Sequence, residues 1–205
     1  MKKAILGGSF NPIHNGHLMM AQSAHEQFGL DDIVVMPNKT TYYKENLAFV
    51  SDEHRMNMIR LAIEGKSYLS LSDMEIKRGG VTHTIDTVRE YKSMYPDIDL
   101  YFIIGGDSLE WIDRWVEADE LLDSMTFLSA VRGETDIRRS KEIIERIKKE
   151  HPRSNIELLN MKQCAISSSD IRKKISIGED VREMLPVNVY RYIMEHELYN
   201  GEENL

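Results

Sequence analysis

Two histidines stand three residues apart in the stretch GGSFNPIHNGHL, which covers residues 7–18. The apolar spacing that follows predicts a helix, so His14 and His17 fall on its first turn and can face one point together. The free N–H groups and the dipole at a helix N-terminus favour an anion. Imidazole N–H groups in that place suit phosphate oxygens, and they can stabilise charge that develops during phosphoryl or nucleotidyl transfer.

The glycines before the histidines, Gly7 and Gly8, let the backbone turn tightly and approach a ligand closely. The stretch matches neither common phosphate-binding loop, because it contains no G-x-G-x-x-G and no G-K-[ST]. Taken alone, it also fits a plain turn with one capping histidine and one core histidine. A zinc site is a further alternative, although no third ligand stands near the pair.

A second motif, ISSSDIR, covers residues 166–172. Any of its three serines can cap a helix, and the same N-terminus can hold a phosphate. Arg172 follows about one turn later, where a guanidinium can bind a terminal phosphate through two hydrogen bonds. Taken alone, a serine-capped helix with a surface arginine is the simpler interpretation.

A third motif, GGDS at residues 105–108, follows the apolar run LYFII. Asp107 is of a type that often binds ribose hydroxyls, although Gly-Gly-Asp also forms simple turns. In an open α/β sheet, ligands bind at the carboxyl ends of the strands. The three motifs each follow a predicted strand, so we expect them at one edge of the sheet. Their agreement favours a nucleotide or phosphate site.

The elements that must position these motifs alternate between strand and helix patterns. The first 36 residues predict a strand, a glycine turn, a helix and a second strand, which form a βαβ unit and imply a parallel sheet. Further strands are predicted at 68–71, 100–104, 125–131 and 156–159, and further helices after Ser51, at 84–95, at 140–150, after ISSS and near Pro186. We therefore predict an α/β fold: a Rossmann-like parallel sheet with helices on both faces and a C-terminal helical part from about residue 165. We expect a single domain over residues 1–205.

The composition limits the classes of function. The chain has 205 residues, 41% hydrophobic and 29% charged, which is typical of a soluble globular protein. Its net charge of −8 argues against a general nucleic-acid binder, so a polyanion site must be a local basic pocket. The single cysteine, Cys164, rules out an intramolecular disulfide and argues against a cysteine-rich metal site. The apolar run at the N-terminus is too short for a signal peptide or a membrane span, so we expect a cytoplasmic protein without nucleic-acid or membrane partners.

The motifs GGSFNPIHNGH and ISSSDIR together resemble the H-x-G-H nucleotidyltransferase superfamily. Within it, MPNKTTYYKE, SDEHRMNMIRLAI, GVTHTIDTVREYKSMYP, FIIGGDSLEWIDRW and LPVNVYRYIMEHELY are similar to bacterial nicotinate mononucleotide adenylyltransferases. These stretches run in the same order from about residue 3 to residue 199. The resemblance implies that ATP and nicotinate mononucleotide give nicotinate adenine dinucleotide (NaAD) and pyrophosphate. It also implies Mg²⁺ as cofactor, carried mainly by the ATP phosphates, with no metal-ligating residue in the protein.

The resemblance assigns a role to each matching residue. Phosphate charge would be neutralised by the catalytic residues His14, His17, Lys44 and Arg172. ATP would contact Gly8, Ser9, Phe10, Gly105, Asp107, Arg132 and Ser168. The pyridine nucleotide would contact Thr84, Asp86 and Trp115. Asn11 stands where the family more commonly has aspartate.

Three other functions stay open on the sequence. A sibling adenylyltransferase could act on nicotinamide mononucleotide or phosphopantetheine, although the TIDT and DRW elements disfavour phosphopantetheine. A nucleotide-binding sensor would hold ATP without releasing pyrophosphate. A zinc-binding structural module would contain metal when purified. The oligomeric state is not determined by the sequence, which is compatible with a homo-oligomer.

Overall fold

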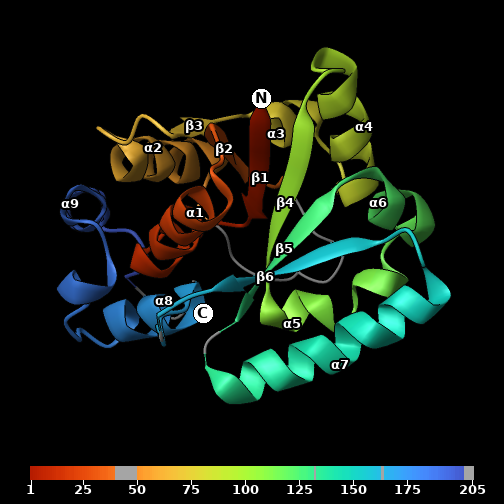
Figure 1. Ribbon diagram of the computed structural model, residues 1–205. Helices are drawn as coiled ribbons and strands as arrows, with labels where there is room; N and C mark the ends of the chain where they lie inside the picture. The colour runs from red at the N-terminus through yellow and green to blue at the C-terminus, as the bar shows by residue number, and fades with distance from the viewer. Residues whose placement is uncertain (40–49, 132, 163, 201–205) are drawn as a thin grey trace.

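The computed structural model in Figure 1 describes residues 1–39, 50–131, 133–162 and 164–200. In these residues six parallel strands form one sheet, in the order β3-β2-β1-β4-β5-β6. The strands are β1 Lys2–Gly8, β2 Asp32–Pro37, β3 Leu69–Leu71, β4 Asp99–Gly105, β5 Thr126–Val131 and β6 Asn155–Asn160. The chain runs outward from β1 to β3 and then returns to place β4 beside β1. That reversal is the topological switch point at which open α/β sheets bind ligands.

The central strand β1 shows why a continuous apolar run forms a buried strand. Ala4 and Leu6 belong to the hydrophobic cluster on one face of the sheet, and Ile5 belongs to the cluster on the other face. All three side chains are at most 3% exposed. A strand covered on both faces needs apolar residues at every position, as the sequence predicted.

Helices cover both faces of the sheet, as Figure 1 shows. The first face carries α1 Asn15–Phe28, α2 Asp52–Ile63, α8 Ser168–Ser176 and α9 Val187–Glu195. The second face carries α3 Met74–Arg78, α4 Thr84–Met94, α5 Gly106–Leu109, α6 Ala118–Ser124 and α7 Glu134–Glu150. The predicted α/β fold with a Rossmann-like parallel sheet is confirmed.

Local signals in the sequence set several helix ends. Gly29 ends α1 in the left-handed conformation, with φ of 60°. The Ser51 hydroxyl accepts a hydrogen bond from the His54 N–H at the start of α2. Of the three serines in ISSSDIR, Ser167 is the cap, because its hydroxyl accepts the Asp170 N–H at 3.1 Å.

Other elements differ from the prediction. The helix predicted from residue 140 begins at Glu134, where Gly133 precedes an acidic first turn. The short helices α3, α5 and α6 were not predicted, since elements of four to seven residues carry too little periodicity. Within α9, Val189 and Ile193 are fully buried, whereas Met194 is 38% exposed.

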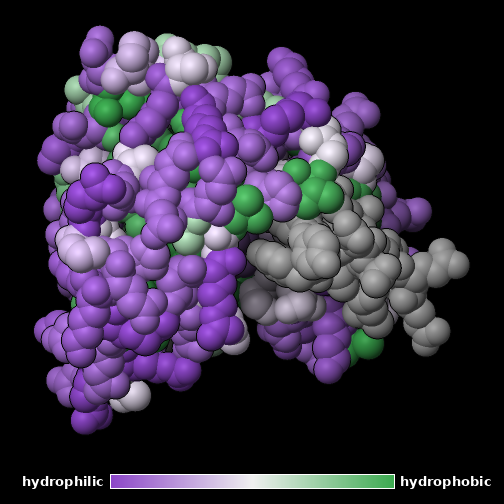
Figure 2. Space-filling view, turned by 90° about the vertical axis from the view of Figure 1, so that its right-hand side faces the viewer, coloured by the Kyte–Doolittle hydropathy of each residue, from purple (hydrophilic) through white to green (hydrophobic). Residues whose placement is uncertain are grey.

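The outer surface around α4, α6 and α7 is mainly hydrophilic, with small separated hydrophobic areas (Figure 2). Within the described part of the chain, no helix is long and apolar enough to span a bilayer.

Candidate active site

The loop after β1 carries the first predicted motif. The last paired residues of β1 and β2 are Gly8 and Pro37, and the Asn38 N–H donates to the Gly8 carbonyl at 3.0 Å. Phe10 then turns the chain with a φ of 46°, and its ring folds back over Gly8. A Cβ at Gly8 would lie 3.1 Å from that ring, so glycine is needed for the close approach.

The histidine pair lies where the spacing predicted, at the first turn of α1. The two rings stack with centroids 3.7 Å apart, and the Phe10 ring meets the His17 ring edge-on at 4.9 Å. The His17 Nδ1 accepts the backbone N–H of His14 at 3.2 Å. In neutral His17 the proton therefore sits on Nε2, where it can donate to a phosphate oxygen.

Gly16, between the histidines, is a site residue that sequence reasoning missed. A Cβ at this position would lie 3.1 Å from Cε1 and Nδ1 of the His14 ring. It would also lie 3.4 Å from the Cys164 Sγ. Gly16 therefore allows the His14 ring to pack against the helix, and the glycine inside the H-x-G-H pattern was the available signal.

Helix α8 brings the second motif to the same loop. The Ser168 hydroxyl donates to the Pro12 carbonyl at 2.9 Å, and Nη1 of Arg172 donates to the Asn11 carbonyl at 2.9 Å. The buried Nε of Arg172 has no hydrogen-bond partner among the described residues. Partial burial lowers the pKa of Arg172 from its usual value. The first and second motifs thus meet in space, as predicted.

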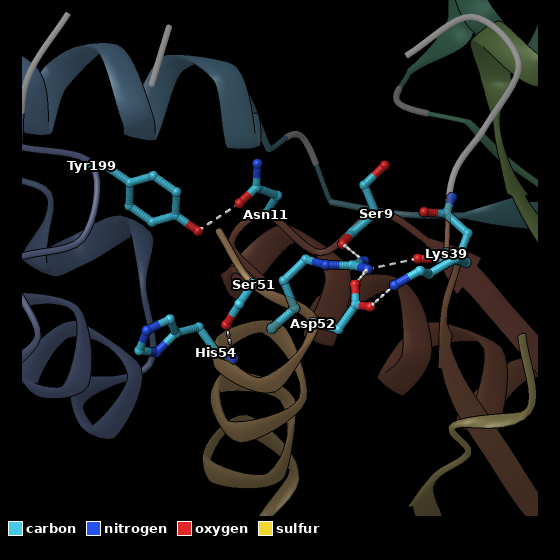
Figure 3. Close-up of polar contacts among 9 residues, drawn as sticks. Ser9, Asn11, Lys39, Ser51, Asp52, His54 and Tyr199 are labelled. Carbon is cyan, nitrogen blue, oxygen red and sulfur yellow. Dashed lines mark hydrogen bonds and ion pairs between the residues drawn. The ribbon is translucent and has the colours of Figure 1, made fainter. Parts of the chain in front are cut away.

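The end of the chain also reaches this loop. The Tyr199 hydroxyl donates to Oδ1 of Asn11 at 2.8 Å, and both residues are only 1% exposed (Figure 3). Burial raises the pKa of Tyr199 far above its usual range, so its phenol stays a neutral donor. A neutral amide oxygen is a suitable acceptor for it, which gives Asn11 a structural role in this chain.

The third motif stands at the exit of β4, the other side of the switch point. The β1–β4 pairing matches Leu6 with Ile103, so both strands end at the same edge. Gly105 closes β4 and Gly106 opens α5, where a Cβ would lie 3.1 Å from a backbone carbonyl of β5. Asp107 is exposed in the first turn of α5, and can therefore meet a ligand.

The three residues expected to contact the pyridine nucleotide lie on elements of the second face. Thr84 begins α4, and Asp86, two residues later in the first turn, is exposed. Trp115 is half-buried, with its ring edge-to-face against Phe127 at 6.4 Å. Trp111, which sequence reasoning passed over, is more open at 53% exposure.

Two predicted residues, Lys44 and Arg132, lie outside the described residues. Across the described ranges, no group of three or more histidine, cysteine, aspartate or glutamate side chains could hold a metal ion. The zinc-binding alternative therefore gains no support from this part of the chain.

Comparison with known proteins points in one direction. The family described as cytidylyltransferase-like matches residues 5–174. A protein of Lachnoclostridium phytofermentans named "Probable nicotinate-nucleotide adenylyltransferase" is 37% identical over 198 residues, which cover 97% of this chain and 98% of the relative. A Listeria monocytogenes protein of the same name is 36% identical, with 97% of each chain covered. The solved Plasmodium falciparum nicotinic acid mononucleotide adenylyltransferase complexed with NaAD is 26% identical, with a TM-score of 0.81, and the match covers 97% of this chain and 98% of that one.

Proposed function

The chain belongs to the cytidylyltransferase-like family, and we infer that it is a nicotinate-nucleotide adenylyltransferase of NAD biosynthesis. It joins the AMP part of ATP to nicotinate mononucleotide, and the products are NaAD and pyrophosphate. The observation that carries this conclusion is the stacked histidine pair beside the switch point, in a chain whose full-length relatives bear that name. The P. falciparum structural neighbour, complexed with NaAD, supports the same substrate class.

The reaction needs positioning and charge stabilisation rather than a covalent nucleophile. An oxygen of the mononucleotide phosphate forms a bond to the α-phosphorus of ATP. The bond from that phosphorus to the β-phosphate oxygen breaks, and pyrophosphate leaves with the electron pair. We propose that His17 donates a hydrogen bond from Nε2 to a phosphate oxygen. His14, stacked against it, would stabilise the same negative charge.

The ATP contacts of the remaining residues are part of this proposal. The backbone of Gly8, Ser9 and Phe10 would line the nucleotide, and Gly105 with Asp107 would lie near the ribose. Ser168 and Arg172 would hold the β- and γ-phosphates while keeping the loop in place. We propose that Lys44 and Arg132 also contact the phosphates or adenine.

Enzymes of this kind use a divalent metal with ATP, and we propose Mg²⁺. Mg²⁺ is commonly bound by one or two carboxylates together with substrate phosphates and water. Among the described residues, no group of three or more histidine, cysteine, aspartate or glutamate side chains could hold a metal ion, which supports an ion carried mainly by the ATP phosphates and water. When bound, the ion would neutralise charge on the triphosphate.

We also propose that residues 1–205 form a single nucleotidyltransferase domain. The first hydrophobic cluster joins Ala4 and Ala21, near the N-terminus, to Ile171 and Ile193 in the C-terminal helices. Helix α8 begins at Ser168, close to the boundary of about 165 expected for the C-terminal helical part. A shared core of this kind favours one folding unit.

The proposed function is tested by pyrophosphate release. The purified protein is assayed with ATP, Mg²⁺ and one acceptor at a time: nicotinate mononucleotide, its amide or phosphopantetheine. We expect the acid form to give the highest kcat/KM. Higher turnover with the amide or with phosphopantetheine would assign the chain to a sibling activity, and ATP binding without pyrophosphate release would indicate a sensor.

Trp115→Ala is expected to raise the KM for nicotinate mononucleotide about tenfold and to leave the KM for ATP nearly unchanged, because an aromatic stacking contact contributes about 1 kcal/mol or more. Steady-state kinetics with each substrate varied in turn measures the difference. Trp111→Ala is the matched control, since this exposed tryptophan is close in sequence. If Trp115→Ala raised the KM for both substrates equally, the proposed stacking of Trp115 on the pyridine ring would be wrong.

A further inference from the structure

Arg55, on helix α2, is a buried cation beside the loop after β1. It is 1% exposed and is the largest fully buried side chain among the described residues. Its Nη1 donates to the Ser9 carbonyl at 2.7 Å, and its Nη2 donates to the Asn38 carbonyl at 2.8 Å. Nη2 also donates to Oδ1 of Asp52 at 2.6 Å. The guanidinium therefore has three acceptors, and two of the residues that supply them, Ser9 and Asp52, are labelled in Figure 3.

The two carbonyls belong to the points where β1 and β2 separate. The strands pair as far as Gly8 and Pro37, and the Asn38 N–H still reaches the Gly8 carbonyl. The next carbonyls along the chain, those of Ser9 and Asn38, lie just after the last paired residues of the two strands. Both residues are partly buried, and the planar fork of one buried guanidinium serves both carbonyls. Arg55 thereby links the two chain segments one residue beyond the last residue pair of β1 and β2.

Acidic and basic neighbours balance the buried charge. Asp52, in the first turn of α2, pairs with Arg55 and also with Lys39. Partial burial acts to raise the pKa of Asp52, but hydrogen bonds from Lys39 and Arg55 outweigh it and hold the pKa below its usual value. A carboxylate is also favoured at a helix N-terminus. The exits of β1 and β2 and the start of α2 are thus joined through ionised groups.

The loop is held from the opposite side as well. Arg172 and Ser168 donate to the carbonyls of Asn11 and Pro12. Arg55 holds the Ser9 end, so the backbone proposed to line the nucleotide is anchored at both ends by distant side chains.

We propose that Arg55 is a positioning residue for ATP, which sets the Ser9–Phe10 backbone against the nucleotide by tying together the exits of β1 and β2. The inference rests on the proposed function, because the Ser9–Phe10 backbone is its ATP-binding element. Arg55 reaches ATP only through the loop that it holds. Lysine could keep the charge beside Asp52, but its single ammonium lacks the planar fork that serves both carbonyls.

The test compares Arg55→Lys and Arg55→Met with Arg60→Met, an exposed arginine on the same helix. For Arg55→Met we expect kcat/KM for ATP to fall about thirtyfold, somewhat less than the ~10²-fold cost of a full 1 Å misplacement. For Arg55→Lys we expect a fall of about fivefold, while the KM for nicotinate mononucleotide stays within about twofold in both variants. Arg60→Met should match the wild type. All assays are run well below each variant's thermal unfolding midpoint, with the folded fraction measured by circular dichroism.

The positioning role would be overturned if kcat/KM fell equally for ATP and for nicotinate mononucleotide. It would also be overturned if folded Arg55→Met kept an unchanged kcat/KM for ATP. If Arg55→Met does not fold, Arg55→Lys decides: full activity overturns the proposal and a selective ATP defect supports it. A wild-type protein that releases no pyrophosphate would contradict the proposed function instead. Calorimetric titration of ATP into wild type and Arg55→Lys would then still test the role of Arg55. Weaker ATP binding by Arg55→Lys would support the positioning role, and equal binding would overturn it.

Discussion

His17→Ala is expected to lower kcat by about two to three orders of magnitude, the range found when a donor to developing charge is removed. The His17 ring is only partly buried, and its Nδ1 accepts a hydrogen bond from the His14 backbone. Its removal should therefore leave the fold intact while the Nε2 donor disappears. Single-turnover measurement of pyrophosphate release, beside circular dichroism, separates the two effects.

His25→Ala is the matched control for this change. His25 lies on the same helix, where its Nδ1 bonds the Leu30 carbonyl at 2.7 Å and its ring stacks on Tyr68. We expect this control to lower stability without a comparable loss in kcat. Near-normal turnover of His17→Ala would remove its role in stabilising the transition state.

Arg172→Met is expected to lower kcat/KM for ATP by about a hundredfold or more, since each hydrogen bond to a charged group contributes about 1.5–3 kcal/mol. The residue anchors the Asn11 carbonyl and is proposed to hold the β- and γ-phosphates. Pyrophosphate contains those two phosphates, so its inhibition constant should rise in parallel with the KM for ATP. Affinity for nicotinate mononucleotide should change little.

Lys173→Met, at the neighbouring exposed position of α8, controls for the loss of one positive charge. Arg172→Lys should have a kcat/KM for ATP between those of wild type and Arg172→Met, because an ammonium cannot bind a phosphate through two parallel hydrogen bonds. If Arg172→Met left pyrophosphate inhibition unchanged, Arg172 would serve only to hold the loop.

Much of this architecture was predictable because it follows from local patterns. Continuous apolar runs identified the buried strands, as the burial of β1 on both faces illustrates. Gly29 and Ser51 marked helix ends through conformational and capping preferences that act over a few residues. The spacing of His14 and His17 placed their side chains on one helical turn, and their rings do stack.

The residues that hold the site together were not predictable in this way. Arg55 contacts Ser9 across 46 positions, and Tyr199 contacts Asn11 across 188. Helical spacing places Arg55 on the same face of α2 as the buried Met58 and Ile59, but it does not show which groups a buried arginine would bind. Those groups, the carbonyls just after β1 and β2, become its neighbours only in the folded chain.

The sequence by itself determined the class of fold, the edge of the sheet that carries the motifs and, with the family resemblance, the reaction. Hydrophobic periodicity and helix capping are short-range effects, so they can be recognised along the chain. Only the tertiary structure decided how the loop after β1 is held, by Arg55 at one end and by Arg172, Ser168 and Tyr199 at the other. The physical reason is that buried polar groups must find partners, and those partners become neighbours only after the chain has folded.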